Sequence, residues 1–404
     1  MRLQKIKENA INNVDYYKPL NICDEGCFPI VNKSIIRRDY SAFLSNNIDE
    51  QIRAEILKQL DDKSVRCKIS YNELSQIGEF IIEETTGTSG FPLRVVKSVS
   101  ERYKLGVNLY RCRKKIDPSF DMHLFRTFNH TTLHQNNPKP YDFTKDHIIE
   151  IYKEMLSNKI RWLHTSIVPL KKHIKILEQE GITEFPYLKY IELTGNYLEK
   201  EDIKFVQDFF GVQVTNLYGC METWAIAYGI AGYGMDICED VVNVEIVDDE
   251  GNLIEEQGKV GNVIVTSLVC NSMPLIRYDM GDRGKIEINN GRKQLIIQEG
   301  RNNQYIKGLD RKILGTKQFG NILKMTIQKA NVDDISFIQF VQKEIDLIEI
   351  KINDFDQKDI FIPALLAMIE ERLNVKLRYE ITILNEEQIY AKENEKQELF
   401  ICKA

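Results

Sequence analysis

The sequence predicts an α/β protein with a large N-terminal domain in residues 1–307 and a small α+β domain in residues 308–404. A stretch rich in glycine and hydroxyl side chains, residues 85–92, lies between two β-prone runs and precedes a helical pattern, which is an α/β arrangement. Further along, predicted strands repeatedly end in small polar loops. After residue 308 the pattern changes to short strands and helices, which indicates a separate unit.

The composition is that of an ordinary globular protein, with 43% hydrophobic and 28% charged residues in a chain of 404. The formal net charge of −6 gives no electrostatic footprint of a nucleic-acid binder. No apolar run approaches the ~20 residues of a membrane span, and the first residues lack the apolar core of a signal peptide. We therefore expect a cytoplasmic protein with no nucleic-acid or membrane partner.

The first elements are predicted to be helices, because residues 35–44 and 50–60 carry apolar side chains at spacings of three and four. Strands are expected at 80–84 and 93–96, on either side of the glycine-rich stretch. Ser98 or Ser100 can cap the helix that follows, which runs through residue 113.

The middle of the N-terminal domain alternates strands with helices. Residues 117–133 are irregular and rich in Phe, His and Thr, which suits the lining of a pocket. The expected helices are 145–157 and 170–180, and the expected strands are 161–166, 190–193 and 212–217. In open α/β sheets ligands bind beyond the carboxyl ends of the strands, so four strand ends, including that of 80–84, point towards one crevice.

Residues 233–300 form a β-rich subdomain, which we expect to be a small distorted barrel. Its predicted strands include 242–247 and 263–268, followed by a hairpin through Asn289-Asn290-Gly291. The C-terminal domain is expected to contain two helices and three strands. These are helices 319–329 and 360–373 and strands 335–341, 347–352 and 377–384, the last with Leu377, Tyr379, Ile381 and Ile383 on one apolar face.

The eight cysteines are scattered, which predicts reduced and mostly buried thiols rather than a disulfide framework. Cys23 and Cys27 have a spacing used by zinc ligands, but no second pair lies nearby, so a loop is favoured. Cys220 is expected to be an inert thiol. His130 and His134 have helical spacing without the glutamate of a zincin, so lining of a pocket or a surface position is favoured.

The glycine-rich stretch is suited to binding an anion. Its glycines permit backbone conformations that other residues resist, and its amides and hydroxyls can surround a polyphosphate. It lacks the Gly-Lys-Ser/Thr ending of a Walker loop. The residues expected to hold phosphate are Thr85, Thr86, Gly87, Thr88, Ser89 and Gly90.

Four motifs, in this order, resemble those of the acyl-adenylate-forming (AMP-binding) enzymes. Residues 85–92 resemble their phosphate loop, T-S-G-T-T-G-x-P-K, and residues 218–222 resemble Y-G-x-T-E. Gly281-Asp282 matches G-D, and Gly300-Arg301 matches the start of G-R-x-x-D-x-I-K. The resemblance covers nearly the whole chain, and it is greatest to the phenylacetate–CoA ligase-like and capsule-biosynthesis-associated branch.

The resemblance implies an ATP-dependent acid ligase, which forms an acyl adenylate, releases pyrophosphate and passes the acyl group to a thiol of coenzyme A or of a carrier protein's phosphopantetheine. Such catalysis is mostly positioning and charge stabilisation. The acid pocket is expected to include residues 125–133, 162–166 and 224–228, a lining that fits an aromatic or another small acid. The sequence leaves open the acid itself, the acceptor and the oligomeric state.

The resemblance also assigns roles to single residues. Tyr218 stacks on adenine, Gly219 beside it is another residue of the nucleotide site, and Gly195 and Asn196 border the base. Asp282 and Arg301 contact the ribose, and Glu222 holds Mg²⁺ against the phosphates. Lys396, on a mobile C-terminal domain, bridges the carboxylate and the α-phosphate.

Several positions depart from the family's pattern. Leu93, Met221, Gln304 and Glu395 stand where the loop lysine, a threonine, the hinge aspartate and a glycine are usual. Glu395 places an acid beside Lys396, so Lys392 is kept as an alternative catalytic lysine. No structural zinc is expected, because residues 232–236 lack the histidine of relatives that bind it. A non-catalytic nucleotide-binding or scaffold homologue is the alternative function.

Overall fold

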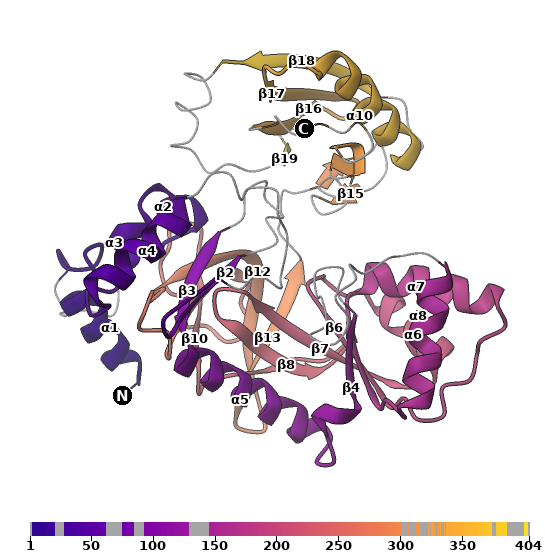
Figure 1. Ribbon diagram of the computed structural model, residues 1–404, viewed down its shortest axis with the longest axis horizontal. Coiled ribbons are helices and arrows are strands. Elements are labelled where there is room, and N and C mark those ends of the chain that lie inside the picture. Colours follow the sequence, from indigo (N-terminus) through magenta and orange to yellow (C-terminus); the bar gives the residue numbers. More distant parts are fainter. Residues whose placement is uncertain are drawn as a thin grey trace. The chain divides into compact units, whose positions relative to one another are not determined.

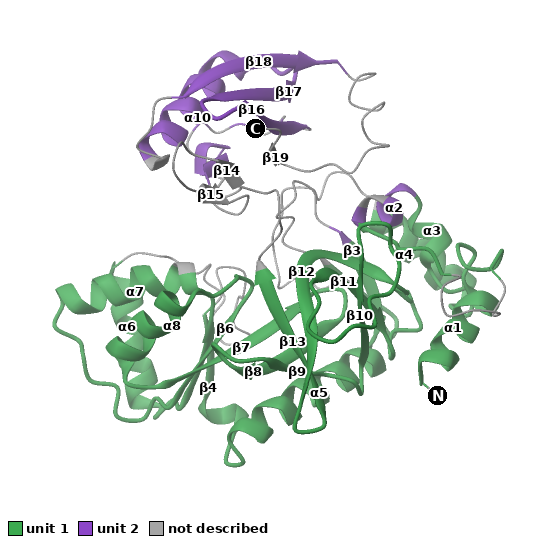
Figure 2. Ribbon diagram, turned by 180° about the vertical axis from the view of Figure 1, so that it is seen from behind, with its two compact units in different colours: residues 1–32, 39–85, 94–300 green, residues 33–38, 86–93, 301–404 purple. Residues whose placement is uncertain are grey.

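The computed structural model describes most of the chain. The described residues are 2–20, 28–61, 75–84, 93–128, 145–299, 305–307, 312–315, 322–323, 325–327, 330, 332, 335, 337–373, 377–385 and 400–402. The chain divides into two compact units, one of residues 1–32, 39–85 and 94–300 and the other of residues 33–38, 86–93 and 301–404 (Figure 2). Each unit is described by itself below.

The N-terminal residues are helical, as predicted, but the helix expected over 35–44 is divided. The helices are α1 (Arg2–Asn13), α2 (Lys33–Arg38), α3 (Tyr40–Phe43) and α4 (Glu50–Asp61). Asp39 has φ −150° and ψ 84°, and its side chain accepts a hydrogen bond from the backbone N–H of Ala42. This N-cap begins a new helix, so the apolar spacing continues through a break in the backbone.

The strands predicted on either side of the glycine-rich stretch are confirmed. β1 (Ser75–Ile77), β2 (Phe80–Glu84) and β3 (Arg94–Ser98) form a three-stranded antiparallel sheet. α5 (Val99–Ile116) follows at once, and its N-cap is Ser98 rather than Ser100. Ser98 and Glu101 form a reciprocal capping box, which satisfies two of the free amides at the start of the helix.

A ten-stranded mixed sheet is the centre of the first unit (Figure 1). Its strand order is β10-β11-β12-β13-β9-β8-β7-β6-β5-β4. Strands β4 to β7 are parallel to one another, whereas β7 to β13 pair antiparallel. The strands are β4 (Phe125–Phe128), β5 (Trp162–Thr165), β6 (Tyr190–Thr194), β7 (Gln213–Cys220), β8 (Trp224–Ile230), β9 (Met235–Ile237), β10 (Val242–Val247), β11 (Gly261–Ser267), β12 (Tyr278–Asn289) and β13 (Arg292–Glu299).

Two of these strands differ from the prediction. β4 occupies part of the region expected to be irregular, after a short 3₁₀ helix, η2 (Met122–Leu124). β7 continues through the residues expected to form a loop and reaches Cys220, because it pairs with β8 across a tight turn. Strands β9 to β13 also continue the same sheet.

Helices cover the parallel half of the sheet on one face. α6 (Lys145–Ser157), α7 (Ile167–Gln179) and α8 (Lys200–Phe210) lie together beside β4 to β7 (Figure 1). Their buried side chains share one apolar core with Leu163, Ile191 and Val214 of the strands. Successive side chains of a strand point to opposite faces of the sheet, so the residue that follows each of these three points to the other face, where α5 packs. That row comprises Thr127, His164, Glu192 and Thr215, which pair with one another across the strands.

The second unit has the expected α+β composition. β16 (Ile338–Glu344), β17 (Leu347–Asn353), β18 (Arg378–Leu384) and β19 (Phe400–Cys402) form a sheet in the order β18-β17-β16-β19, and α10 (Lys358–Leu373) shares its core. A two-stranded ribbon is formed by β14 (Tyr305–Lys307) and β15 (Lys312–Gly315).

The last predicted strand of this unit lies at the edge of the sheet. Of the side chains predicted to share one face, Leu377 is buried, whereas Ile381 and Ile383 of β18 are exposed. Among the described residues of the whole chain, no helix has the length and apolar character that crossing a membrane requires.

Candidate nucleotide site

The carboxyl ends of β6 and β7 bring three of the predicted site residues together. Thr194 pairs with Leu217, and the Thr194 hydroxyl donates to the Leu217 carbonyl at 2.9 Å. Gly195 follows with a φ of 75°, a conformation that strongly favours glycine, and turns the chain away from the strand. Gly195 and Asn196 therefore begin the loop next to Tyr218, as expected for residues that border one ligand.

Tyr218 and Asp282 meet although 64 residues separate them in the chain. The Tyr218 hydroxyl donates to Asp282 Oδ2 at 2.8 Å. A second tyrosine makes the converse link, since the Tyr278 hydroxyl donates to Glu222 Oε1 at 2.6 Å. Tyr278 and Asp282 lie on β12, whereas Tyr218 and Glu222 lie on β7 and the turn after it. Two crossed hydrogen bonds thus connect the motif at 218–222 to the motif at 281–282.

The turn that carries Glu222 is unusually close. A side chain at Gly219 would place its Cβ 2.1 Å from the Trp224 carbonyl oxygen, a distance that no real Cβ adopts. Trp224 itself has a φ of 60°, which is uncommon for a residue with a side chain. Gly219 is therefore required by the backbone of the turn, whatever it contributes to binding a base.

A buried cluster of charges, the Glu83 cluster, lies against this turn. Lys97 Nζ is 2.7 Å from Glu83 Oε2 and also donates to the Met221 carbonyl at 2.7 Å. Arg102 Nε donates to Glu83 Oε1 at 2.7 Å, and Trp224 Nε1 donates to Glu83 Oε2 at 3.1 Å. The side chains of Lys97 and Glu83 are each 1% exposed. The cluster therefore connects the β2–β3 sheet to the turn.

A second buried cluster, the Glu192 cluster, lies further along the same face. Arg113 donates to both oxygens of Glu192, at 2.9 and 2.7 Å. The Tyr228 hydroxyl donates to Oε2 at 2.6 Å, and His164 Nδ1 lies 2.7 Å from Oε1. Because a carboxylate only accepts hydrogen bonds, His164 Nδ1 carries the proton. His164 and Tyr228 belong to the segments expected to line the acid pocket.

The charges of both clusters favour ionised glutamates. Burial alone would raise the pKa of Glu83 and of Glu192, but the neighbouring cations outweigh burial and lower both. For Glu83 these are Lys97 and Arg102, and for Glu192 the largest contribution is Arg113. Burial and the charge of Glu192 raise the pKa of Tyr228, so its hydroxyl remains a donor.

Cys220 has the environment of an inert thiol. Burial, with the nearby charge of Glu222, raises the pKa of its thiol far above the usual range, and its Sγ lies 3.3 Å from the Thr223 hydroxyl. Cys112, Cys238 and Cys270 are buried free thiols, as predicted. The Sγ atoms of Cys112 and Cys238 lie 3.6 Å apart. Cys23 and Cys27, like His130 and His134, lie outside the described residues.

The donor set at the turn fits a magnesium ion. Glu222 supplies a hard carboxylate oxygen, and Tyr278 holds its other oxygen in place. Mg²⁺ usually keeps several waters and binds one or two carboxylates together with substrate phosphates. Accordingly, no group of three or more His, Cys, Asp or Glu side chains among the described residues is needed, and none is found there.

The other predicted site residues lie outside the described part of the chain. These are Thr85, Thr86, Gly87, Thr88, Ser89 and Gly90 of the glycine-rich stretch, together with Arg301, Lys396 and the alternative Lys392. The strands β2 and β3 that flank the stretch are described, and so is Leu93, which is buried.

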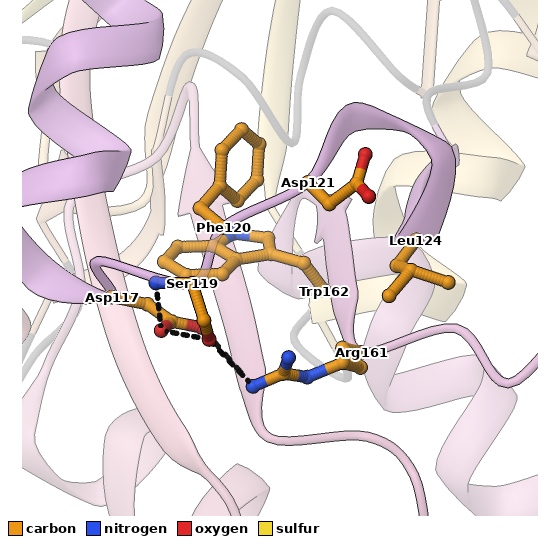
Figure 3. A pocket seen from close by; sticks show the side chains of 7 residues that line it. All are labelled: Asp117, Ser119, Phe120, Asp121, Leu124, Arg161 and Trp162. Atoms are coloured by element: carbon orange, nitrogen blue, oxygen red, sulfur yellow. Dashed lines mark hydrogen bonds and ion pairs between the residues drawn. The ribbon is translucent and has the colours of Figure 1, made fainter.

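A small cavity lies away from these residues. Its lining, shown in Figure 3, includes Asp117, Ser119, Phe120, Arg161 and Trp162. Arg161 and Trp162 are at the start of β5, so the cavity is at the amino end of the parallel strands, opposite to Thr194 and Tyr218. Trp162 is buried there against Tyr190, with ring centroids 4.3 Å apart. It is therefore a core residue rather than a wall of the expected acid pocket.

Sequence reasoning missed Tyr278, Lys97, Glu83 and Glu192. Tyr278 could have been found, because it stands only four residues before Asp282 in the same strand. The charged residues gave no such signal. Each occupies a short strand in which a charged side chain is expected to face solvent.

Part of the amino-acid sequence is similar to a known ligase. No family model matches the chain. A stretch of 85 residues, 20% of the chain, is 36% identical to a phenylacetate–coenzyme A ligase of Thermus thermophilus and covers 19% of that protein. The match thus spans about a fifth of the length of this curated relative.

Solved structures resemble the whole chain. The structure of 2-hydroxyisobutyryl-CoA ligase in the postadenylation state, in complex with 2-HIB-AMP, has a TM-score of 0.59 at 12% identity and covers 95% of this chain and 85% of that one. The same ligase in the thioesterification state, with 2-HIB-AMP and CoA, also has a TM-score of 0.59 at 12% identity, over 100% and 88% of the two chains.

The chain therefore has the same fold as these ligase structures, and the predicted α/β fold class is confirmed. The matching stretch of sequence is, in addition, similar to phenylacetate–coenzyme A ligase.

Proposed function

We propose that this protein activates a carboxylic acid with ATP, forming an acyl adenylate and releasing pyrophosphate, and then transfers the acyl group to a thiol. The observation that carries the proposal is the hydrogen bond between Tyr218 and Asp282. It joins two motifs that are far apart in the sequence, at the carboxyl edge of the sheet where α/β folds bind their ligands. A nucleoside can be bound by this pair, because the tyrosine ring can stack on the base while the carboxylate accepts hydrogen bonds from the ribose.

The described residues have distinct tasks in this reaction. Tyr218 offers its ring to adenine, and Gly195 and Asn196 border the base. Asp282 accepts hydrogen bonds from the ribose hydroxyls, which suits a carboxylate with two oxygens. Glu222 would hold Mg²⁺, which when bound neutralises charge on the phosphates. Tyr278 fixes the orientation of the Glu222 carboxylate through its 2.6 Å hydrogen bond.

Residues outside the described part complete the proposal. Thr85, Thr86, Gly87, Thr88, Ser89 and Gly90 bind the β- and γ-phosphates, and Arg301 contacts the ribose. Lys396 bridges the acid and the α-phosphate from a C-terminal domain that moves between the two half-reactions. In this proposal, residues 1–307 form the adenylating domain and residues 308–404 form the mobile domain. Gly300-Arg301 lies close to the hinge between them in the sequence.

The substrate is proposed to be an aromatic or another small acid, and the acceptor coenzyme A or the phosphopantetheine of a carrier protein. The structures of 2-hydroxyisobutyryl-CoA ligase, which contain 2-HIB-AMP and in one case also CoA, support a small acid and a thiol acceptor. ATP and coenzyme A are cytoplasmic metabolites, so the reaction is placed in the cytoplasm.

Exchange of labelled pyrophosphate into ATP, measured with a panel of carboxylic acids, tests the proposal. One or more acids should support exchange, and Asp282→Ala should reduce it on the order of a hundredfold. The matched control is Asp249→Ala. The Asp249 side chain is 72% exposed and pairs with Arg283, the neighbour of Asp282 on β12. Lys396→Ala should also reduce exchange, and an unchanged rate would transfer the catalytic role to Lys392.

A second outcome would replace the proposal with the alternative function. If calorimetry detects ATP binding and no acid supports exchange, the protein is a non-catalytic nucleotide-binding homologue. Met221 is the described departure that favours this alternative, because it stands where the family has a threonine at the α-phosphate.

A further inference from the structure

We propose that Lys97 is a positioning residue that holds the Glu222 turn in register with the strands around the glycine-rich stretch. The inference rests on the proposed function, since it concerns the same nucleotide and metal site. No motif of the sequence includes Lys97. Its role follows from the contacts that its ammonium group makes.

The first step is the position of Lys97 on β3. This strand pairs antiparallel with β2, and the two strands end on either side of residues 85–92. Lys97 pairs with Ile81, and Glu83 pairs with Val95, so Lys97 and Glu83 lie diagonally on one face of the hairpin. Their ion pair at 2.7 Å therefore connects the two strands that hold the stretch.

The second step is the bond to the turn. Lys97 Nζ donates to the Met221 carbonyl at 2.7 Å, and this carbonyl belongs to the peptide bond that leads directly into Glu222. A peptide unit is planar, so fixing its oxygen also fixes the direction of the Glu222 N–H. A charge-assisted hydrogen bond is about twice as strong as a neutral one, which makes this restraint stiff.

The third step is the energetic reason for a lysine here. An ammonium group that is 1% exposed is costly unless it is paired and hydrogen-bonded. Glu83 supplies the pairing charge, and Arg102 and Trp224 complete the hydrogen bonds of Glu83. A neutral core residue would serve packing without that cost. What the lysine adds is a donor to the backbone of the turn, at the Met221 carbonyl.

Taken together, the hairpin that flanks the phosphate-binding stretch and the turn that carries the metal-binding carboxylate share one buried ammonium group. A residue that positions a metal ligand without touching the metal typically changes metal affinity or activity by tenfold to a hundredfold on mutation. Lys97 is expected to act at that level.

The test compares four variants with the wild type. Lys97→Met removes the bond to Met221, whereas Glu83→Gln retains it and removes the pairing charge. The double variant Lys97→Met with Glu83→Gln buries no unpaired charge, so it should fold even where Lys97→Met alone does not. Arg102→Met is the matched control, because it removes a cation from the same glutamate but leaves the hydrogen bond from Lys97 to the Met221 carbonyl.

Two measurements are made on each variant. One is the Mg²⁺ concentration that gives half-maximal ATP–pyrophosphate exchange. The other is the Mg²⁺ concentration that half-saturates the change in Trp224 fluorescence in the presence of ATP, in a Trp162→Phe background. Trp162 and Trp224 are the two tryptophans of the chain, and Trp224 directly follows the turn. The fluorescence titration requires binding but no catalysis.

Both half-saturating concentrations should rise on the order of tenfold in Lys97→Met and in the double variant, and less than threefold in Glu83→Gln and Arg102→Met. A double variant that is folded and binds Mg²⁺ like the wild type would overturn the role of Lys97. So would a wild type that shows no Mg²⁺-dependent fluorescence change. Exchange absent with every acid, together with a normal fluorescence titration, would reject the proposed function alone.

Discussion

The Glu83 and Glu192 clusters are built from the same parts. Each places a buried glutamate between α5 and β8, and each receives an arginine from the helix and an aromatic donor from the strand. Arg102 and Arg113 are separated by about three helical turns of α5, and Trp224 and Tyr228 both belong to β8. One helix and one strand are therefore fastened at two points.

The clusters differ in their last hydrogen-bond donor. In the Glu192 cluster, His164 donates to the glutamate, and four hydrogen bonds from the described residues converge on that carboxylate. In the Glu83 cluster, Lys97 divides its donors between the glutamate and the backbone of the turn. Similar composition thus serves two purposes: the first cluster holds the sheet and helix together, and the second also restrains a site.

The largest effect should come from breaking the Glu192 cluster. Glu192→Leu leaves Arg113 as a buried unpaired charge, so the free energy of unfolding should fall by about 3–5 kcal/mol. Urea denaturation measures this loss. Glu154→Ala, which removes the more exposed pair with Arg126, should cost less than about 1 kcal/mol. Equal losses in the two variants would show that burial does not separate these pairs.

A buried histidine extends the comparison to pH. Burial lowers the pKa of His173 from 6.5 to about 4, so the folded state resists protonation that the unfolded state accepts. Its contribution to stability is complete above pH 6.5 and is lost as the pH falls towards 4.

Between pH 6.5 and about pH 5 this loss should amount to about 2 kcal/mol, measured by urea denaturation across pH. The clustered glutamates have lowered pKa values and weaken the fold only at more acidic pH, below their unfolded pKa of about 4.5. His173→Gln should remove the dependence in the first range and leave the second. A variant with the same slope as the wild type would contradict this assignment.

The turn beside the Glu83 cluster should tolerate no side chain at Gly219. Gly219→Ala pushes a Cβ against the Trp224 carbonyl, so the free energy of unfolding should fall by about 1–3 kcal/mol. Exchange activity should fall as well, because the shifted turn carries Glu222. A variant as stable and active as the wild type would show that the turn is looser than its contacts indicate.

The smallest effect is expected between the two clusters. Gly106 of α5 faces Trp224, and an added Cβ would lie at an ordinary 3.7 Å from the edge of that ring. Gly106→Ala should therefore stabilise the fold by about 0.5–1 kcal/mol, through the better helix propensity of alanine. Urea denaturation of this variant is the counterpart of the Gly219 experiment, and a loss of stability would mean that the helix cannot adjust.

Local signals in the sequence predicted much of the fold. The capping box at Ser98, the strands beside the glycine-rich stretch and α6 follow from residues that are close in the chain. The pairing of distant strands did not. β9 joins the two halves of the sheet through only a few residues, among them Asp236 opposite Gln294 and Tyr228, and no local pattern specifies that register.

The residues of the candidate site that belong to sequence motifs could be predicted. The residues that reach the site only through packing could not. The positions of Tyr218 and Asp282 along the chain identified them, but their contact required the completed sheet. Lys97 and Glu192 were missed because a charged residue in a strand ordinarily faces solvent. Only the neighbouring elements, α5 above all, show that these side chains are enclosed.

The crossed tyrosine bonds have a consequence for synthesis of the chain. Tyr218 and Glu222 leave the ribosome well before their partners Asp282 and Tyr278, which sit on a strand four places away in the sheet. The parallel strands can gather their helices and core while the later strands are still being made. The proposed affinity for a nucleotide should therefore appear late in translation, when β12 joins the sheet and brings Asp282 to Tyr218 and Tyr278 to Glu222.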